Sequence, residues 1–325
     1  MLENAYKLRD STDVIADPFS DILKLANAQS VMSGGFTAGG SWAIRFPEME
    51  KLKFSAMVRG NCLLLLDGQE APVRVDEGDV LLLSAQRSFV LASELDAVPI
   101  DAASVFTPQV SPMAKLGDGG DCLQVGGFVR LDTVSGKLLT DVLPPLIHVR
   151  ASLPQSAILQ WLLGQLVHEQ AAELPGASLA SAQLAQLIFV QILRVHLETS
   201  DFLAPGWLRA LGDPGIAPAL RLMHSDPARP WHLEELARAT AMSRTTFCLR
   251  FKTVAGVPPL TYLLHWRMRI AERALREQNI PVAALAMSLG YTSESAFSNT
   301  FKRMLGMAPK RYRDAARTAA ECTPR

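Results

Sequence analysis

A stretch of 20 residues near the end of the chain, residues 243–262, occurs a second time at a constant offset of 50 positions. When residues 243–262 are set against residues 293–312, seven positions are identical. The identical pairs are Ser243/Ser293, Phe247/Phe297, Phe251/Phe301, Lys252/Lys302, Gly256/Gly306, Pro259/Pro309 and Tyr262/Tyr312. Because these residues recur in one register, they indicate two copies of one supersecondary unit, around which this part of the fold must be built.

The first copy has the pattern of a helix-turn-helix. Leu233, Leu236 and Ala237 lie on one face of a short helix, and Ser243 is a suitable N-cap for a second helix over residues 244–255. In helix-turn-helix proteins the second helix of such a pair enters the major groove of DNA. We therefore expect the first copy to read DNA with residues near the start of its second helix.

The second copy predicts the same unit with a turn one residue longer. Its first helix begins at Pro281, and Ser293 caps a second helix that ends near residue 305. The helix expected between the copies, over residues 260–277, would be about 27 Å long at 1.5 Å per residue. Successive major grooves on one face of DNA are about 34 Å apart, so the tandem predicts two readers in successive grooves.

The charges of the chain cancel overall but are unevenly distributed. Residues 1–215 contain 15 Lys and Arg against 24 Asp and Glu, whereas residues 216–325 contain 17 against 8. A basic segment of this kind suits a polyanion such as nucleic acid. The charge distribution thus points to the same partner as the repeat, which is double-stranded DNA.

The first half of the chain has the pattern of a β-sandwich or barrel. Short runs rich in Val, Leu, Ile and Phe alternate with Gly, Asp and Pro, which is typical of antiparallel strands with tight turns. The predicted strands cover residues 42–46, 54–59, 62–66, 72–75, 80–84, 88–91 and 122–131. The segment from Val75 to Leu83 is a strand, turn and strand that is similar to a turn of cupin-type jelly rolls.

Beyond Pro145 the apolar residues recur at helical spacing and predict two amphipathic helices, near residues 157–166 and 184–195. Both are apolar over more than one face, which favours a dimer interface over simple packing on the barrel. Residues 201–218 are rich in Gly and Pro and predict a linker. The expected fold is therefore α+β with two domains. Residues 1–150 form an antiparallel jelly roll, 151–200 a helix pair, 201–218 the linker and 219–325 an all-α tandem helix-turn-helix.

The chain shows no pattern of a secreted or membrane protein. The N-terminal residues are polar, so we expect no signal peptide. No apolar run approaches the roughly 20 residues that a membrane-spanning helix needs. The cysteines are far apart in sequence, which argues against a zinc site or a disulfide framework. A cytoplasmic protein follows from these observations.

Around the repeat, the chain strongly resembles the DNA-binding domain of AraC/XylS-type transcription regulators. The resemblance covers residues 216–316 and rests on two motifs, Leu-Glu-Glu-Leu-Ala with Met-Ser-Arg at 233–244 and Leu-Gly-Tyr-Thr-Ser-Glu-Ser-Ala-Phe at 289–297. Segments at 59–64, 77–79 and 143–148 more weakly resemble the cupin-like regulatory domain of one branch of this family. The resemblance implies a regulator that binds promoter DNA as a homodimer, works with RNA polymerase and senses a signal through its N-terminal domain.

The resemblance also assigns expected roles to individual side chains. Arginine can read guanine, asparagine adenine, and glutamate cytosine, whereas other cations contact phosphates and position the protein. The expected base-reading residues are Arg244, Thr245, Cys248, Glu294, Ser295 and Asn299. The expected phosphate contacts are Arg250, Lys252, Arg267, Lys302, Arg303, Lys310 and Arg311. The phenylalanines of the repeat are expected to form core.

Three alternatives are weighed against a ligand-sensing regulator. A metal-dependent cupin enzyme is disfavoured because no histidine precedes His148, so the usual several-histidine site cannot form. We therefore expect no enzyme activity, no metal and no cofactor. A redox sensor built on Cys62 and Cys122 remains open, although buried unreactive thiols are common. An interaction protein that uses the repeated helices without DNA also remains open. Measuring duplex binding at increasing salt concentration would distinguish it from a DNA-binding protein, whose affinity must fall steeply with salt.

Overall fold

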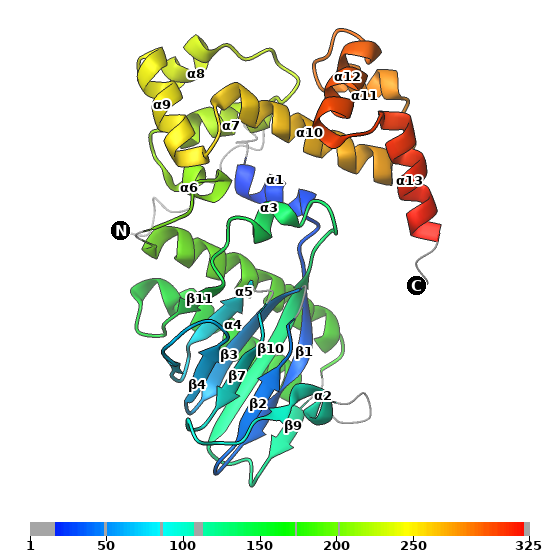
Figure 1. The fold of residues 1–325 in the computed structure, drawn as a ribbon. Coiled ribbons are helices and arrows are strands. Elements are labelled where there is room, and N and C mark those ends of the chain that lie inside the picture. The colour runs from blue at the N-terminus through cyan, green and yellow to red at the C-terminus, as the bar shows by residue number, and fades with distance from the viewer. Residues whose placement is uncertain are drawn as a thin grey trace. The chain divides into compact units, whose positions relative to one another are not determined.

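The structure is a computed structural model that describes residues 17–48, 51–84, 87–106, 113–172, 174–200 and 202–321. The described chain divides into two compact units (Figure 1). One unit contains residues 26–203, and the other contains residues 17–25 together with the chain from residue 204 onward. The first unit is a pair of sheets with helices and the second is all-helical, so the predicted α+β fold class is confirmed.

The strands of the first unit form two sheets. The six-stranded sheet has the order β11-β6-β3-β10-β1-β9. Its strands are β1 (Gln29–Ala38), β3 (Leu52–Arg59), β6 (Val80–Leu83), β9 (Met113–Leu116), β10 (Cys122–Arg130) and β11 (Leu146–Val149). The five-stranded sheet has the order β5-β4-β7-β2-β8. Its strands are β2 (Ala43–Phe46), β4 (Cys62–Leu66), β5 (Val73–Val75), β7 (Phe89–Ala92) and β8 (Ile100–Asp101).

Neighbouring strands are antiparallel as predicted, except for the parallel edge pairs β1–β9 and β2–β8. The seven strands predicted from sequence are found within two residues of the expected ends. Strands β1, β8, β9 and β11 were not predicted from the sequence. In β1 the reason is clear, because Gly34 and Gly35 interrupt its alternation and its register shifts at Gly34.

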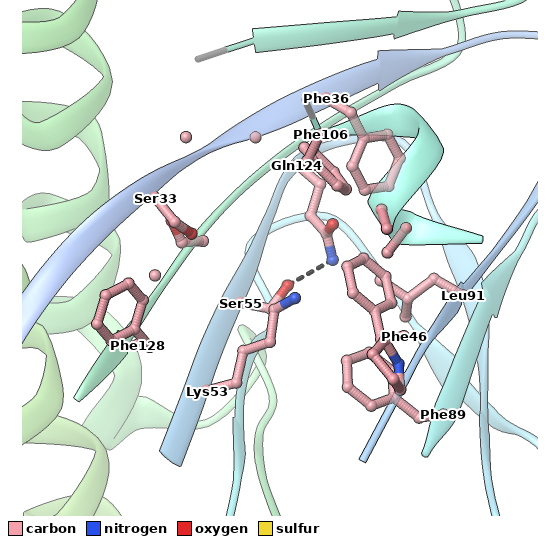
Figure 2. Close-up of a pocket in the computed structure, with 17 residues that line it drawn as sticks. Ser33, Phe36, Phe46, Lys53, Ser55, Phe89, Leu91, Phe106, Gln124 and Phe128 are labelled. Carbon is pink, nitrogen blue, oxygen red and sulfur yellow. Dashed lines mark hydrogen bonds between the residues drawn. The ribbon is translucent and has the colours of Figure 1, made fainter. Parts of the chain in front are cut away.

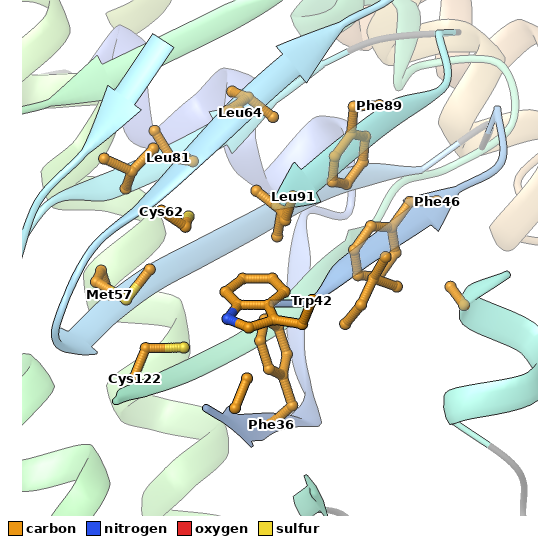
Figure 3. Close-up of a cluster of buried hydrophobic side chains, with 14 of the residues drawn as sticks. Phe36, Trp42, Phe46, Met57, Cys62, Leu64, Leu81, Phe89, Leu91 and Cys122 are labelled. Carbon is orange, nitrogen blue, oxygen red and sulfur yellow. The ribbon is translucent and has the colours of Figure 1, made fainter. Parts of the chain in front are cut away.

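The two sheets face each other and enclose a cavity of about 330 Å³ at one end of their interface (Figure 2). The short helix α2 (Ala102–Val105) and Phe106 also border this cavity. The remaining interface is filled by side chains from both sheets (Figure 3). Trp42 packs edge-on against Phe36 at a centroid distance of 5.2 Å. Each such buried side chain contributes about 1.5–3 kcal/mol of transfer free energy, so this interface holds the unit together.

A turn between β5 and β6 anchors the segments that resemble a cupin-like domain. Gly78 has φ 81°, a conformation that favours glycine. The carboxylate of Asp79 is buried and accepts hydrogen bonds from the backbone N–H groups of Ala151 (2.8 Å) and Asp76 (3.1 Å). His148 Nε2 lies 2.7 Å from the same carboxylate. His148 therefore has a structural partner, and it ties β11 to the turn.

Two helices cover the six-stranded sheet, α4 (Ala157–Ala172) and α5 (Ala177–Thr199). They pack on each other, and α5 also packs on β1 (Figure 1). The Gln186 side chain on α5 accepts a hydrogen bond from Ser30 N–H (2.9 Å) and donates one to the Ala28 carbonyl (3.1 Å). Short helices α3 (Lys137–Thr140) and η1 (Pro154–Ser156) complete the unit. Both predicted helices are thus present, and each is longer than the expected residues 157–166 and 184–195.

The expectation that no helix is long and apolar enough to cross a membrane needs correction. Within the described ranges α5 meets that test by length and composition, with a mean hydropathy of 1.3 in its most apolar window. The residues Ala185, Ile188, Phe189 and Ile192 on α5 are fully buried within the unit. The apolar character of α5 is therefore explained in part by packing on β1 and α4.

The second unit consists of helices α1 and α6–α13. Their bounds are α1 (Pro18–Leu25), α6 (Trp207–Gly212), α7 (Ala217–Ser225), α8 (Leu233–Ala239), α9 (Arg244–Ala255), α10 (Pro259–Glu277), α11 (Val282–Ser288), α12 (Glu294–Leu305) and α13 (Pro309–Glu321). The predicted linker over residues 201–218 contains a helix that was not expected, because α6 occupies residues 207–212. Trp207, Leu208 and Ala210 of α6 are buried, so the glycines and prolines here bound a short packed helix.

Helix α1 lies far from the rest of its unit in sequence but packs on α6, α7 and α10. Phe19 and Ile22 are buried, and the Phe19 ring lies 6.2 Å from that of Trp207. The Asp21 carboxylate is 3.2 Å from Nδ1 of the buried His224, whose Nε2 lies 2.9 Å from the Tyr262 hydroxyl. Arg273 donates to the Lys24 carbonyl at 2.9 Å. These contacts make α1 part of the helical unit.

Candidate nucleic-acid interface

The two copies of the repeat fold into matching helix-turn-helix units at opposite ends of α10 (Figure 1). In the first, Ser243 caps α9 by accepting a hydrogen bond from the Thr246 N–H at 3.2 Å. In the second, Ser293 caps α12 through the Ala296 N–H at 3.1 Å. We call α9 and α12 the reading helices, since each is the second helix of its unit. The 19 residues of α10 give it a length of about 29 Å.

The phenylalanines of the repeat are core residues, as expected. Phe247, Phe251, Phe297 and Phe301 are all fully buried. Tyr262 packs edge-on against Phe251 at 5.8 Å, and Tyr312 packs against Phe301 at 5.5 Å. The repeated Phe, Phe and Tyr positions therefore fix each reading helix to the element that follows it.

The turns of the two units differ by one residue, as predicted. Ala241 in the first turn has φ 52°, which is unusual for a residue with a side chain, and Gly290 in the second has φ 80°. The backbone of Gly290 lies against the loop before α8, so closely that a Cβ there would be 1.9 Å from the Ala228 carbonyl oxygen. Gly290 thus brings the second helix-turn-helix into direct contact with the loop that precedes the first helix-turn-helix.

On α9 the first turn is exposed. Arg244 and Thr245 are both exposed, and Arg244 Nη1 lies 3.0 Å from an oxygen of Glu234 on α8. More than half of each side chain in this ion pair is exposed. A solvent-exposed pair of this kind contributes about 0–1 kcal/mol, so it is easily exchanged for a DNA contact.

Of the residues expected to read bases on α9, Cys248 is the one that is half-buried. At the offset of 50, Cys248 corresponds to Ser298, and both are half-buried. Cys248 packs against the buried core of the first helix-turn-helix. Leu249 is the residue that corresponds to Asn299, and its side chain is 65% exposed. Leu249 was not among the expected base-reading residues, and its methyl groups suit the methyl group of thymine.

On α12 the expected base-reading residues Glu294, Ser295 and Asn299 are all exposed. Ser295 Oγ lies 3.1 Å from Oγ of the capping Ser293. Glu294 is the first residue of the helix, where a negative charge is favoured by the helix dipole with no ligand present. Asn299 stands one turn further along and retains its capacity to bond two groups of an adenine edge.

The expected phosphate contacts fall into two groups. Lys252, Lys302, Arg303, Lys310 and Arg311 are exposed, and the described part of the chain provides no ion pair to any of them. Arg250 instead makes a two-oxygen ion pair with Asp213, its Nη2 lying 2.9 Å from Oδ1. Arg267 donates to the carbonyls of residues 227–229, at 2.5 Å for Pro227, and burial lowers its pKa. The first group is free to meet phosphates, whereas Arg250 and Arg267 have structural partners.

Comparison with protein families supports this description. Residues 17–198 match a family model described as a cupin, and residues 236–315 match one described as a helix-turn-helix domain. A putative AraC-like transcription regulator of Streptomyces antibioticus is 43% identical over 297 residues, which cover 91% of this chain and 98% of the relative. The chain belongs to the AraC-like transcription regulators. A second AraC-like relative, from Streptomyces lividans, is 42% identical over the same extent.

Among solved structures, this AraC-like regulator is similar to the DNA-binding domain of AdpA, described as a global transcriptional factor and solved with a target DNA. The identity is 32% and the TM-score is 0.32, with 34% of this chain and 99% of that chain covered. The family membership makes the chain a transcription regulator with a helix-turn-helix DNA-binding domain and an N-terminal cupin domain.

The thiols of this AraC-like regulator are poorly placed for redox chemistry. Cys62 and Cys122 are buried between the sheets, with exposed fractions of 1% each (Figure 3). Burial raises the pKa of Cys62 to about 12 and also raises the pKa of Cys122. The thiolate is the reactive species, so both thiols are nearly inert at neutral pH. Within the described ranges no group of three His, Cys, Asp or Glu side chains is placed to hold a metal ion.

The thiol arrangement gives a direct prediction. In a variant with Cys248→Ser and Cys322→Ser, we expect no thiol to react with a water-soluble disulfide reagent in the native protein within minutes. Cys322 lies outside the described residues and is removed to leave Cys62 and Cys122 alone. Two thiols should react after denaturation, which serves as the control. Rapid native reaction of either thiol would restore the redox-sensor hypothesis.

Proposed function

We propose that this AraC-like regulator binds promoter DNA with α9 and α12 in successive major grooves. The observation that carries the proposal is the pair of matching reading helices at the two ends of α10, each with an exposed first turn. On α9 the proposed base-reading residues are Arg244 and Thr245, together with Leu249. On α12 they are Ser295 and Asn299, and Glu294 is retained as a weaker candidate.

Arg244→Ala tests base reading, and Lys302→Ala tests phosphate contact. Arg244→Ala is expected to weaken binding to the preferred site by about 1–3 kcal/mol and to relax the preference at one base pair. Lys302→Ala is expected to weaken binding to all sequences and to reduce the salt slope by about one. Selection of binding sites from random duplexes, followed by titrations on specific and random DNA, measures both effects. Equal losses on specific and random DNA for both variants would contradict the assignment.

The helix pair α4 and α5 supports a homodimer. Four of its apolar side chains remain substantially exposed: Ile158 (54%), Trp161 (62%), Leu179 (68%) and Leu187 (49%). Exposed apolar side chains grouped on neighbouring helices mark interaction surfaces, and a second copy of the chain offers the same apolar residues.

Trp161→Glu is expected to shift the protein from dimer to monomer at micromolar concentration, because it places a charge at the proposed interface. Light scattering after size-exclusion chromatography measures the mass. Arg150→Glu, an exposed change before α4, is the control and should leave the mass unchanged. A wild-type monomer at these concentrations would contradict the dimer.

For the regulatory input, we propose a small molecule bound by the cupin domain in place of thiol oxidation, because Cys62 and Cys122 are buried with raised pKa values. RNA polymerase is the proposed protein partner and the cytoplasm the proposed location, since promoter DNA and polymerase meet there. Transcription in vitro from a bound promoter with purified polymerase tests this partnership. The proposal assigns the chain no catalytic step.

A further inference from the structure

The cavity between the two sheets combines one basic side chain with an otherwise uncharged wall. Of the 17 residues that line it, Lys53 is the one whose side chain carries a charge or titrates near neutral pH. Strand β3 alternates so that Lys53, Ser55 and Met57 share the face directed at the opposite sheet, while Leu52, Phe54 and Ala56 lie on the other face. A lysine thus occupies a position that a jelly roll usually fills with an apolar side chain.

The surroundings of Lys53 are aromatic. Its Nζ lies 3.5 Å from the ring centroid of Phe46 and 5.5 Å from that of Phe89. These two rings, on β2 and β7, are stacked at 4.7 Å. The described residues provide Lys53 with neither an ion pair nor a hydrogen bond. The ammonium is therefore compensated only by the faces of aromatic rings, which are worth less than a carboxylate partner.

Two further polar side chains stand beside Lys53 on the same sheet. Gln124 on β10 and Ser55 on β3 are both buried, and Gln124 Nε2 donates a hydrogen bond to Ser55 Oγ. Figure 2 shows Ser55 and Gln124 on one side of the cavity and Phe46, Phe89 and Leu91 on the other, and the Lys53 ammonium reaches the Phe46 ring from the side of Ser55. One wall of the cavity is consequently polar with a single positive charge, and the opposite wall is apolar.

We propose that this cavity binds a small monocarboxylate with an apolar body, and that this ligand is the regulatory signal. Its carboxylate pairs with the Lys53 ammonium beside Ser55 and Gln124, and its apolar body lies along Phe46, Phe89 and Leu91. The volume of about 330 Å³ is near the lower end of the roughly 300–1,000 Å³ of small-molecule sites, so the ligand is compact. The inference rests on the proposed function only in calling the ligand a signal.

The titration of Lys53 agrees with an anionic ligand. Burial lowers the pKa of Lys53 to about 7, and no other titratable group among the lining residues offsets this effect. A bound carboxylate favours the ammonium and raises this pKa again. Affinity for a carboxylate is therefore greatest below pH 7 and falls as the pH rises, by up to about tenfold per pH unit above the pKa of the free protein.

The test uses the full-length protein and calorimetric titration with octanoate and 3-phenylpropanoate, which compare a chain with a ring. The matched neutral probes are octanamide and 3-phenylpropanamide. We expect at least one carboxylate to bind about 10-fold to 100-fold more tightly than its amide, because a hydrogen bond to a charged group is lost in the amide. We also expect Lys53→Met to abolish this difference and Lys137→Met, an exposed change elsewhere in the unit, to preserve it.

Several outcomes would overturn the proposal: equal affinities of carboxylate and amide, an undiminished preference in Lys53→Met, or no binding of either carboxylate below pH 7. Thermal unfolding shows whether Lys53→Met is folded. We expect this variant to have a higher melting temperature than the wild type, because it removes a poorly compensated charge. DNA titrations of the same preparations keep the two proposals separate. Unchanged DNA affinity with no carboxylate binding refutes only the cavity assignment, whereas carboxylate binding without DNA binding refutes only the proposed function.

Discussion

Raising the salt concentration from about 50 to about 200 mM is expected to weaken the binding of this regulator to any DNA duplex by about 500-fold. Each phosphate contact contributes about −0.9 to the slope of log affinity against log salt. Five exposed cations of the helical unit lack an ion pair among the described residues: Lys252, Lys302, Arg303, Lys310 and Arg311. Arg250 and Arg267 are not counted, because Asp213 and the carbonyls of residues 227–229 hold their guanidinium groups.

Fluorescence anisotropy with a labelled duplex measures this slope. A double variant, Lys302→Ala with Lys310→Ala, should reduce its magnitude by about two. Lys137→Ala in the other unit serves as the control and should leave it unchanged. A wild-type slope near zero would instead favour an interaction protein that uses the duplicated helices without DNA.

Gly290→Ala is expected to destabilise the helical unit by about 3 kcal/mol or more. An alanine at φ 80° costs about 1–2 kcal/mol by itself. In addition, its Cβ would lie 1.9 Å from the Ala228 carbonyl oxygen, so the backbone must move. The loop at Ala228 resists this movement, because Arg267 donates hydrogen bonds to the carbonyls on both sides and to Ala228 itself.

Gly306→Ala is a matched control, since Gly306 has the same φ of 80° but no atom within 4 Å of the added Cβ. It should cost only the conformational term of about 1–2 kcal/mol. Hydrogen exchange of the α12 amides measures both variants within the full chain. If the two variants exchange alike, the contact between Gly290 and Ala228 contributes nothing to stability.

Much of the helical unit could be predicted from sequence because its signals are local. A serine cap, a buried phenylalanine pair and a glycine with positive φ recur within 14 residues of each other in both copies, and each acts on its own helix. The turn lengths followed from the same local comparison. Long-range contacts carry no such signal, so the structural partners of Arg250 and Arg267 were unforeseen.

The cupin domain shows where sequence patterns fail. Strand β1 was not predicted because its glycines interrupt the alternation of apolar and polar residues. The glycines and prolines near α6 have the composition of a linker, although Trp207 in this segment is buried. Lys53 was overlooked because the strand predicted over residues 54–59 began one residue after it, whereas β3 begins at Leu52. The pairing of β3 with β6 and β10, together with the alternation of its side chains, puts the half-buried Lys53 on the face directed at the opposite sheet. Cys248 was expected to read bases, but the exposed residue is its neighbour Leu249, which lies about 100° further around the helix.

Because α1 belongs to the helical unit, the DNA-binding half of this regulator is not a continuous piece of chain. A fragment that starts at Ala204 would leave the α1 docking surface, including His224 and Trp207, open to solvent. A chimaera that exchanges residues 17–198, the span of the cupin match, would import a foreign helix into that core. The exchangeable module is instead residues 26–203, joined at two points, so a sensor grafted there must supply two chain ends to one DNA-binding unit.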